Sequence, residues 1–228
     1  MEDLREAVLA ANLALPAHGL VKLTWGNVSG VDRRRGLMAI KASGVPYERM
    51  TAEDIVIVDL EHGRVTGGER RPSTDTPTHL ALYRAFPRVG GIVHTHSTWA
   101  TAWAQAHREI PVLGTTHADL AGDPIPLTRA LSPEEVAADY EAATGAALIE
   151  AVGGRAGELP GALVRGHGPF AWGSDPAAAV ANAVTLEEVA KLALLTAMLA
   201  PDRGPLDAVL RDKHFTRKHG PDAYYGQA

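Results

Sequence analysis

The sequence contains no cysteine among its 228 residues. This absence excludes disulfide bridges and thiolate metal sites, so any bound metal must be held by histidine, aspartate or glutamate. The chain also lacks an N-terminal basic segment followed by an apolar run, and we therefore expect no signal peptide. Both absences are compatible with a reducing cytoplasm, which is the location we expect.

Long apolar runs are also missing. The longest mostly apolar stretch runs from Leu192 to Ala200, with Lys191 just before it and Pro201 just after it. It is too short to span a bilayer. The formal net charge is -5, which argues against a broad surface for nucleic acid or membrane. We expect neither as a partner, and an anionic substrate would need a local positive pocket.

The composition is otherwise that of an ordinary globular domain, with 46% hydrophobic and 21% charged residues. The length fits one domain. Helix and strand patterns alternate, with helices expected at 3–18, 77–86, 133–149 and 176–200 and strands at 37–42, 55–60, 92–96 and 162–164. Several strands are joined by short turns, which favours a layered α/β domain with a mostly antiparallel sheet.

The strongest local signal for chemistry is the pair His94 and His96, at the end of an expected buried strand. Side chains two residues apart on a strand point to the same face, so both imidazoles can reach one metal ion. His167 is the best candidate for a third ligand, because it lies between Gly166 and Gly168 at another strand end. Three protein nitrogens would leave a coordination position for substrate, as in catalytic sites.

A second interpretation of this pair stays open. A His-X-His pattern also arises by chance, and either ring can simply satisfy a hydrogen bond in the core. Packing or surface positions are expected for the remaining histidines, which are His18, His62, His79, His107, His117, His214 and His219.

Three loops look suited to small anionic or hydroxylated groups, at 25–27, 41–44 and 73–75. They offer hydroxyls, amides and backbone N–H groups, which suit phosphate, and Lys41 would add positive charge. Asp119 is a candidate acid or base, although a loop aspartate is more often a cap or a solvated charge. The C-terminal tail is basic at residues 211–220, and from these residues alone it would be a solvated terminal segment.

Taken together, the motifs resemble those of the L-ribulose-5-phosphate 4-epimerase family, which belongs to the class II aldolase superfamily. The resemblance covers essentially the whole chain, and the motifs follow the family's order: 23–29, 73–79, 91–97, 114–119, 166–173 and 218–227. One departure lies at Val164-Arg165-Gly166, where close relatives are expected to have histidine and serine. Neither position carries a family function.

The resemblance implies a role for each motif residue. The implied metal-binding residues are Asp75, His94, His96 and His167, holding one divalent cation per subunit, most simply Zn²⁺, with Mn²⁺ or Co²⁺ as alternatives. It leaves open whether Asp75 ligates the metal or acts on the substrate. The implied acid/base pair is Asp119 and Tyr225. The implied substrate- and phosphate-binding residues are Gly26, Asn27, Ser43, Gly44, Ser73 and Thr74.

The resemblance also implies an architecture: one domain over residues 1–228, folded as an α/β/α sandwich and assembled as a fourfold-symmetric (C4) homotetramer. The tail, about 211–228, would then complete a neighbouring subunit's site. The implied reaction is the interconversion of L-ribulose 5-phosphate and D-xylulose 5-phosphate, so the expected partner is a phosphorylated ketopentose.

Three rival functions remain. A class II aldolase of the fuculose-phosphate type would release its products, but those enzymes have glutamate where this chain has Asp75. A non-catalytic adducin-like module would not need the histidines. A hydrolase of the amidohydrolase type also uses His-X-His, but it is a barrel that needs more ligands than can be placed here.

Overall fold

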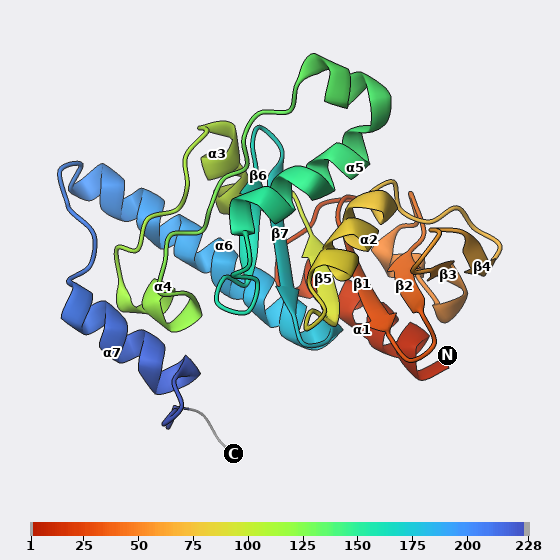
Figure 1. The fold of residues 1–228 in the computed structure, drawn as a ribbon, viewed down its shortest axis with the longest axis horizontal. Coiled ribbons are helices and arrows are strands. Elements are labelled where there is room, and N and C mark those ends of the chain that lie inside the picture. The colour runs from red at the N-terminus through yellow and green to blue at the C-terminus, as the bar shows by residue number, and fades with distance from the viewer. Residues whose placement is uncertain (1, 226–228) are drawn as a thin grey trace.

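The computed structural model describes residues 2–225, so 226–228 of the expected tail lie outside the described residues. Within the described range, seven strands form one antiparallel sheet in the order β4-β3-β2-β1-β5-β7-β6 (Figure 1). Their bounds are β1 (Asn27–Asp32), β2 (Leu37–Lys41), β3 (Ile55–Asp59), β4 (Val65–Gly67), β5 (Gly91–His94), β6 (Gly161–Val164) and β7 (Gly168–Gly173). The expected antiparallel α/β domain is therefore confirmed.

Helices cover both faces of this sheet (Figure 1). They are α1 (Glu2–Ala17), α2 (Thr76–Ala85), α3 (Thr98–Gln105), α4 (Thr115–Leu120), α5 (Pro133–Val152), α6 (Pro176–Leu199) and α7 (Ala208–His219), with 3₁₀ turns at Tyr47–Arg49 and Ala52–Asp54. The two faces of β1 contact different helices. Ser29 bonds to residues of α2, whereas a Cβ on Gly30 would lie 2.9 Å from Val8 of α1 and 2.8 Å from Pro176 of α6.

The core follows from this layering. Apolar residues of the central strands are fully buried, among them Val28, Ile40 and Ile92. Asn12 of α1 supplies hydrogen bonds to β1, since its side chain accepts from the Val28 N–H at 2.8 Å and donates to the Val28 carbonyl at 3.0 Å. These two bonds fix α1 against the strand that begins at the candidate site.

Several local expectations need correction. β5 ends at His94, so His96 lies beyond the strand and not on the same strand face. Asp119 belongs to α4 instead of a loop. Residues 211–219 of the tail belong to α7. α2 begins one residue earlier than expected, with Asp75 as N-cap. No helix among residues 2–225 has the length and apolar character needed to cross a membrane.

Candidate metal centre

The pairing of β5 with β7 brings the three histidines together. His94 is the last residue of β5 and lies opposite Phe170 near the start of β7. His167 occupies the turn between β6 and β7, directly before that start. His96 follows two residues after the end of β5. Because antiparallel neighbours place the end of one strand beside the beginning of the next, residues more than seventy positions apart meet at one sheet edge.

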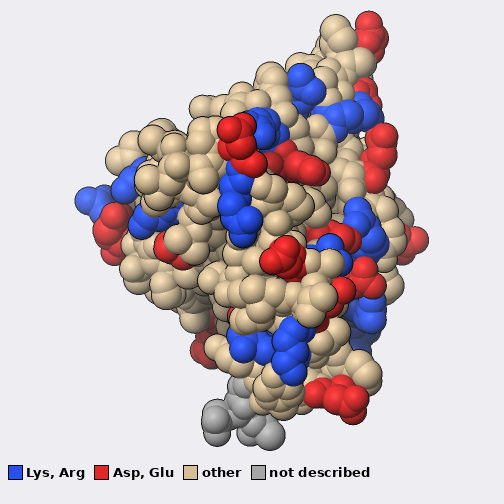
Figure 2. Space-filling view, turned by 90° about the vertical axis from the view of Figure 1, so that its left-hand side faces the viewer, with Lys and Arg blue, Asp and Glu red and all other residues tan. Residues whose placement is uncertain are grey.

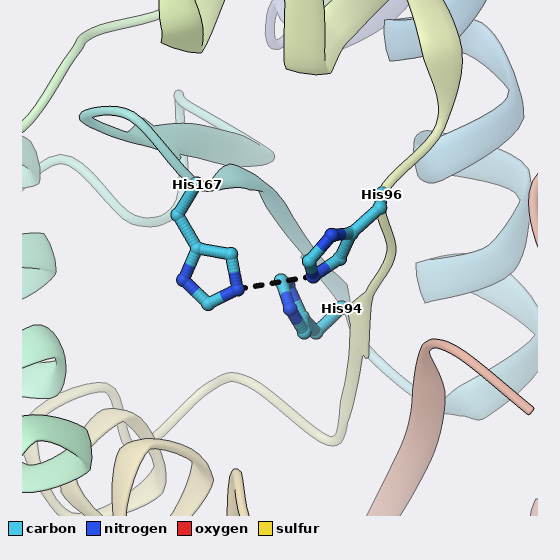
Figure 3. Close-up of side chains that lie close together, drawn as sticks. All are labelled: His94, His96 and His167. Carbon is cyan, nitrogen blue, oxygen red and sulfur yellow. Dashed lines mark hydrogen bonds between the residues drawn. The ribbon is translucent and has the colours of Figure 1, made fainter.

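The rings converge closely (Figure 3). Their centroids are 5.1 Å apart for His94 and His96, and 4.8 Å apart for each pair that includes His167. One nitrogen from each ring lies within 4.8 Å of the others. The Nε2 atoms of His96 and His167 are 3.0 Å apart.

This donor set fits a divalent cation. Zinc–nitrogen bonds of about 2.0–2.1 Å in tetrahedral geometry place two ligand nitrogens roughly 3.3 Å apart, close to the separation of His96 and His167. Burial lowers the pKa of His96, and its neighbours His94 and Asp75 act on it in opposite directions. Burial, His94 and His96 also lower the pKa of His167, to about 4. Both rings are therefore neutral near pH 7 and their lone pairs are available to a metal.

The tautomer of His94 is fixed by the backbone. Its Nδ1 lies 3.0 Å from the carbonyl oxygen of Pro169, which can only accept a hydrogen bond. Nδ1 therefore carries the proton and Nε2 presents its lone pair. The ring also stacks on Phe170 with a centroid separation of 4.2 Å, which holds its plane.

Asp75 lies beside the histidines but outside the group of three converging nitrogens. Asn27 donates to its carboxylate at 2.6 Å. Burial would raise the pKa of Asp75, yet His94, His79 and the bond from Asn27 together hold it below its usual value. Asp75 is thus an anion facing the same cavity as the histidines.

A cavity of about 570 Å³ opens over this centre. Its walls include all six residues expected to bind substrate and phosphate, namely Gly26, Asn27, Ser43, Gly44, Ser73 and Thr74. Gly26 is required there because its φ is +80° and a Cβ would lie 2.9 Å from the carbonyl oxygen of His94. The backbone N–H groups of Ser43 and Ser73 bond to other backbone carbonyls. The Ser73 hydroxyl also accepts bonds from Asn27 at 3.1 Å and from the Asp75 N–H at 3.3 Å.

Lys41 supplies the positive charge at this cavity. Its side chain is almost fully buried, and its Nζ lies 3.3 Å from the carbonyl of Ala42 and 5.1 Å from the ring centre of Tyr47. Burial lowers the pKa of Lys41, while Asp54 opposes this effect. An anionic group in the cavity would also favour its charged form.

Asp119 and Tyr225 lie elsewhere. Asp119 accepts hydrogen bonds from His214 at 3.1 Å and from Arg217 at 2.8 Å, and it lines a separate cavity that shares no residue with the histidine cavity. Burial acts to raise the pKa of Asp119, but Arg217 and His214 lower it below its usual value. The Tyr225 ring lies 4.7 Å from the Arg217 guanidinium. α4 and α7 pack together at one end of the molecule (Figure 1).

Two residues of the cavity wall, Tyr140 and Glu141, are not among the residues predicted from the sequence. They lie within α5 at a break where Asp139 adopts non-helical angles, with φ −160° and ψ 89°. The available signal was Asp139 itself, since an aspartate followed by a helix-forming segment is a typical helix start. The uninterrupted helical pattern around it concealed this start.

The comparisons identify the class. The family model described as "Class II Aldolase and Adducin N-terminal domain" matches residues 6–194, and the chain belongs to this family. A solved L-fuculose 1-phosphate aldolase is 25% identical with a TM-score of 0.81, and the match covers 94% of this chain and 95% of that one. YgbL from Escherichia coli is 25% identical with a TM-score of 0.75, covering 94% and 98%. The L-fuculose-1-phosphate aldolase of Thermus thermophilus is 27% identical with a TM-score of 0.67, covering 89% and 98%.

Proposed function

We propose that the chain is a metal-dependent L-ribulose-5-phosphate 4-epimerase. The observation that supports this most is the convergence of His94, His96 and His167 beside the anionic Asp75, in a cavity that also contains Lys41. The three histidines suit a divalent cation, and the lysine suits a phosphate. We place the enzyme in the cytoplasm, where sugar phosphates are metabolised.

The chemistry follows from the position of the inverted carbon. C4 of the substrate is β to the ketone at C2, so breaking the C3–C4 bond is a retro-aldol step. The C4 hydroxyl loses its proton and becomes an aldehyde, while the bonding electron pair moves to C3 and gives an enediolate. After the aldehyde turns its other face, the bond forms again and the oxygen regains a proton. The reaction needs no oxidant or reductant.

The cation and the protein have separate tasks in this proposal. His94, His96 and His167 would hold the cation, most simply Zn²⁺, with Mn²⁺ or Co²⁺ as alternatives. When bound, the cation supplies Lewis-acid stabilisation of negative charge on substrate oxygens. Lys41 and the hydroxyls of Ser43 and Ser73 would hold the phosphate, so that the aldehyde fragment rotates without leaving.

The proton transfers require a second copy of the chain. Within one chain, Asp119 and Tyr225 are held at α4 and α7, whereas the histidines line another cavity. We therefore assign these two residues to a neighbouring subunit's site, as acid and base on opposite faces of the aldehyde. A C4 homotetramer, with the tail of each subunit at its neighbour's cavity, provides four such sites.

An aldolase is the second candidate, because solved structures 25% and 27% identical to this chain are L-fuculose-1-phosphate aldolases. Asp75 argues for epimerisation, since a side chain one methylene shorter than glutamate reaches different atoms. An adducin-like binding module is disfavoured by the complete set of three histidines.

The test is to incubate metal-loaded protein with L-ribulose 5-phosphate. Formation of D-xylulose 5-phosphate is the expected result. Release of free dihydroxyacetone and glycolaldehyde phosphate would identify an aldolase instead. His96→Ala should lose metal and activity together, whereas Tyr225→Phe should keep the metal and lose turnover. Normal epimerisation by Tyr225→Phe would remove that residue from the mechanism.

A further inference from the structure

His167 has a different anchor from His94. It lies in the turn between β6 and β7, flanked by Gly166, whose φ is +72°, and by Gly168. Among the described residues, the partner of its Nδ1 is the side chain of Tyr140, with the hydroxyl oxygen 2.9 Å away. The two rings lie nearly parallel, with an interplanar angle of 29° and a centroid separation of 6.1 Å.

This contact decides which nitrogen of His167 is available. Its Nε2 is the atom that faces His96 in the cluster (Figure 3). For Nε2 to bind a cation it must be unprotonated, so Nδ1 must carry the proton and donate it to the hydroxyl oxygen of Tyr140. The hydroxyl oxygen of Tyr140 has lone pairs that can accept this bond at the observed distance of 2.9 Å.

The backbone is arranged to deliver this tyrosine. α5 breaks at Asp139, whose carboxylate accepts a hydrogen bond from the Ala142 N–H at 3.0 Å and so caps the second half of the helix. From α2, the buried hydroxyl of Thr78 donates to the carbonyl of Glu141 at 2.7 Å. Both bonds hold the segment that follows the break, and Tyr140 lies there at the cavity.

We propose that Tyr140 is a positioning residue of the metal centre, which holds His167 in the tautomer and orientation that present its Nε2 to the cation, and that the break of α5 at Asp139 exists to place it there. This inference rests on the proposed metal site but not on the identity of the substrate. Residues that orient metal ligands in this way commonly change metal affinity by about 10–100-fold when they are removed.

The experiment measures zinc affinity by competition with a chromophoric chelator, together with the rise in melting temperature caused by zinc. Tyr140→Phe should weaken zinc binding about 10–100-fold and reduce the zinc-induced rise, while the melting temperature of the metal-free protein changes little. Ser174→Ala is the control, because it removes an exposed hydroxyl that lies outside the histidine cavity, and it should leave zinc affinity unchanged.

A second variant and a spectroscopic measurement keep the inference testable if Tyr140→Phe is unstable. Asp139→Ala should weaken zinc binding in the same direction but less. ¹⁵N chemical shifts of the His167 ring should show a single Nδ1-protonated tautomer in the metal-free wild type and a mixture in the Tyr140 variant.

The outcomes separate this inference from the proposed function. Wild-type zinc affinity in Tyr140→Phe, or an unchanged tautomer, would overturn it, and so would a wild-type protein that binds no zinc. Tight zinc binding without epimerisation would overturn the proposed function alone.

Discussion

At the scale of single residues, polar side chains of β1 bond at regular spacing to the N-cap of α2 and to residues within α2. Asn27 bonds to Asp75 at 2.6 Å, and Ser29 bonds to His79 at 2.7 Å and to Tyr83 at 2.8 Å. Residues two apart on the strand thus meet residues one turn apart on the helix. The helix that carries Asp75 is held in register with the strand that lines the cavity, so the acid's position follows from buried hydrogen bonds.

Removing the Ser29 hydroxyl should lower the free energy of unfolding. Ser29→Ala would leave His79 and Tyr83 without the partner they share in a fully buried position, and we expect a loss of about 1–3 kcal/mol in the free energy of unfolding. Urea denaturation of the metal-free protein measures it. Ser174→Ala, which removes an exposed serine hydroxyl, should change stability by less than about 0.5 kcal/mol. Equal effects of the two substitutions would contradict the argument.

A buried histidine outside the metal centre should make stability depend on pH. Burial lowers the pKa of His117 from 6.5 to about 4, although its hydrogen bond to the carbonyl of Asp123 acts to raise it. Between these two values the unfolded chain binds more protons than the folded one. Stability must therefore fall as the pH drops from 6.5 towards 4, with a slope from this residue of up to about 1.4 kcal/mol per pH unit.

Urea denaturation of metal-free protein at several pH values, from about neutral down to about 4.5, checks this slope. His117→Gln should flatten the slope by about that amount, because the titrating group is gone. Thr116→Ala alters the exposed neighbouring residue and should keep the wild-type slope. A variant slope as steep as that of wild type would show that His117 is not held neutral by the fold.

At the scale of elements, α6 supplies the cap that α3 lacks. The N-cap residue of α3, Ser97, makes no side-chain capping bond. Instead, the carboxylate of Glu187 on α6 accepts hydrogen bonds from the backbone N–H groups of Trp99 at 2.8 Å and Ala100 at 2.9 Å. An anion at a helix N-terminus is also favoured by the helix dipole. Since α3 begins two residues after His96, this contact also fixes the chain that carries a candidate ligand.

Glu187→Ala should therefore cost about 1–3 kcal/mol of unfolding free energy, because two donors at the start of α3 lose their acceptor. Glu187→Gln should cost less, since an amide oxygen still accepts but carries no charge. Thermal and urea unfolding measure both, with Glu188→Ala, an exposed neighbour, as the control. If Glu187→Ala were as stable as Glu188→Ala, the carboxylate would not act as the cap of α3.

The accuracy of the sequence predictions depended on whether the signal was local. The expected start of a helix at 133 is confirmed, because its signal lies within four residues, where Ser132 and Glu135 form a capping box. β1 was not predicted, since its sequence Asn-Val-Ser-Gly-Val-Asp lacks a continuous apolar face. Its strand character comes from pairing with β2 and β5, which no local pattern reveals.

In the candidate site, too, local signals were predictable and long-range contacts were not. The His-X-His pair was predicted from strand geometry, yet His96 lies outside β5, and the three rings meet because β5 pairs with β7. Tyr140 was missed because the helical pattern around Asp139 concealed the break of α5, and the bond that Thr78 of α2 makes to Glu141, 63 positions later, leaves no local pattern. Long-range contacts of this kind place side chains that short-range rules assign to a helix interior.

At the scale of the whole molecule, the end formed by α4, α7 and the last turns of α6 bears on the proposed contact between subunits. Lys and Arg alternate there with Asp and Glu, and broad uncharged areas lie between them (Figure 2). Large apolar side chains are exposed near the end of α6 and on α7, with Met198 70%, Leu199 89% and Val209 85% exposed. Apolar exposure next to α4, which carries Asp119, supports the proposal that another subunit packs near it.

The proposed division of each site between two subunits has a consequence that a single-chain site would not share. His96→Ala lacks a metal ligand but keeps Tyr225, and Tyr225→Phe has the opposite defect, so each variant alone should be inactive. In a mixed C4 ring, a site formed by the cavity of one variant and the tail of the other contains both intact halves. Random assembly from equal amounts gives such a pairing at about one site in four.

Co-expression of the two variants should therefore restore roughly a quarter of wild-type epimerase activity, measured as D-xylulose 5-phosphate formed per subunit. Co-expression of His96→Ala with His167→Ala, which damages the same half of every site, should restore none. Failure of the first mixture to recover activity, with tetramers formed, would place both halves of the site in one subunit.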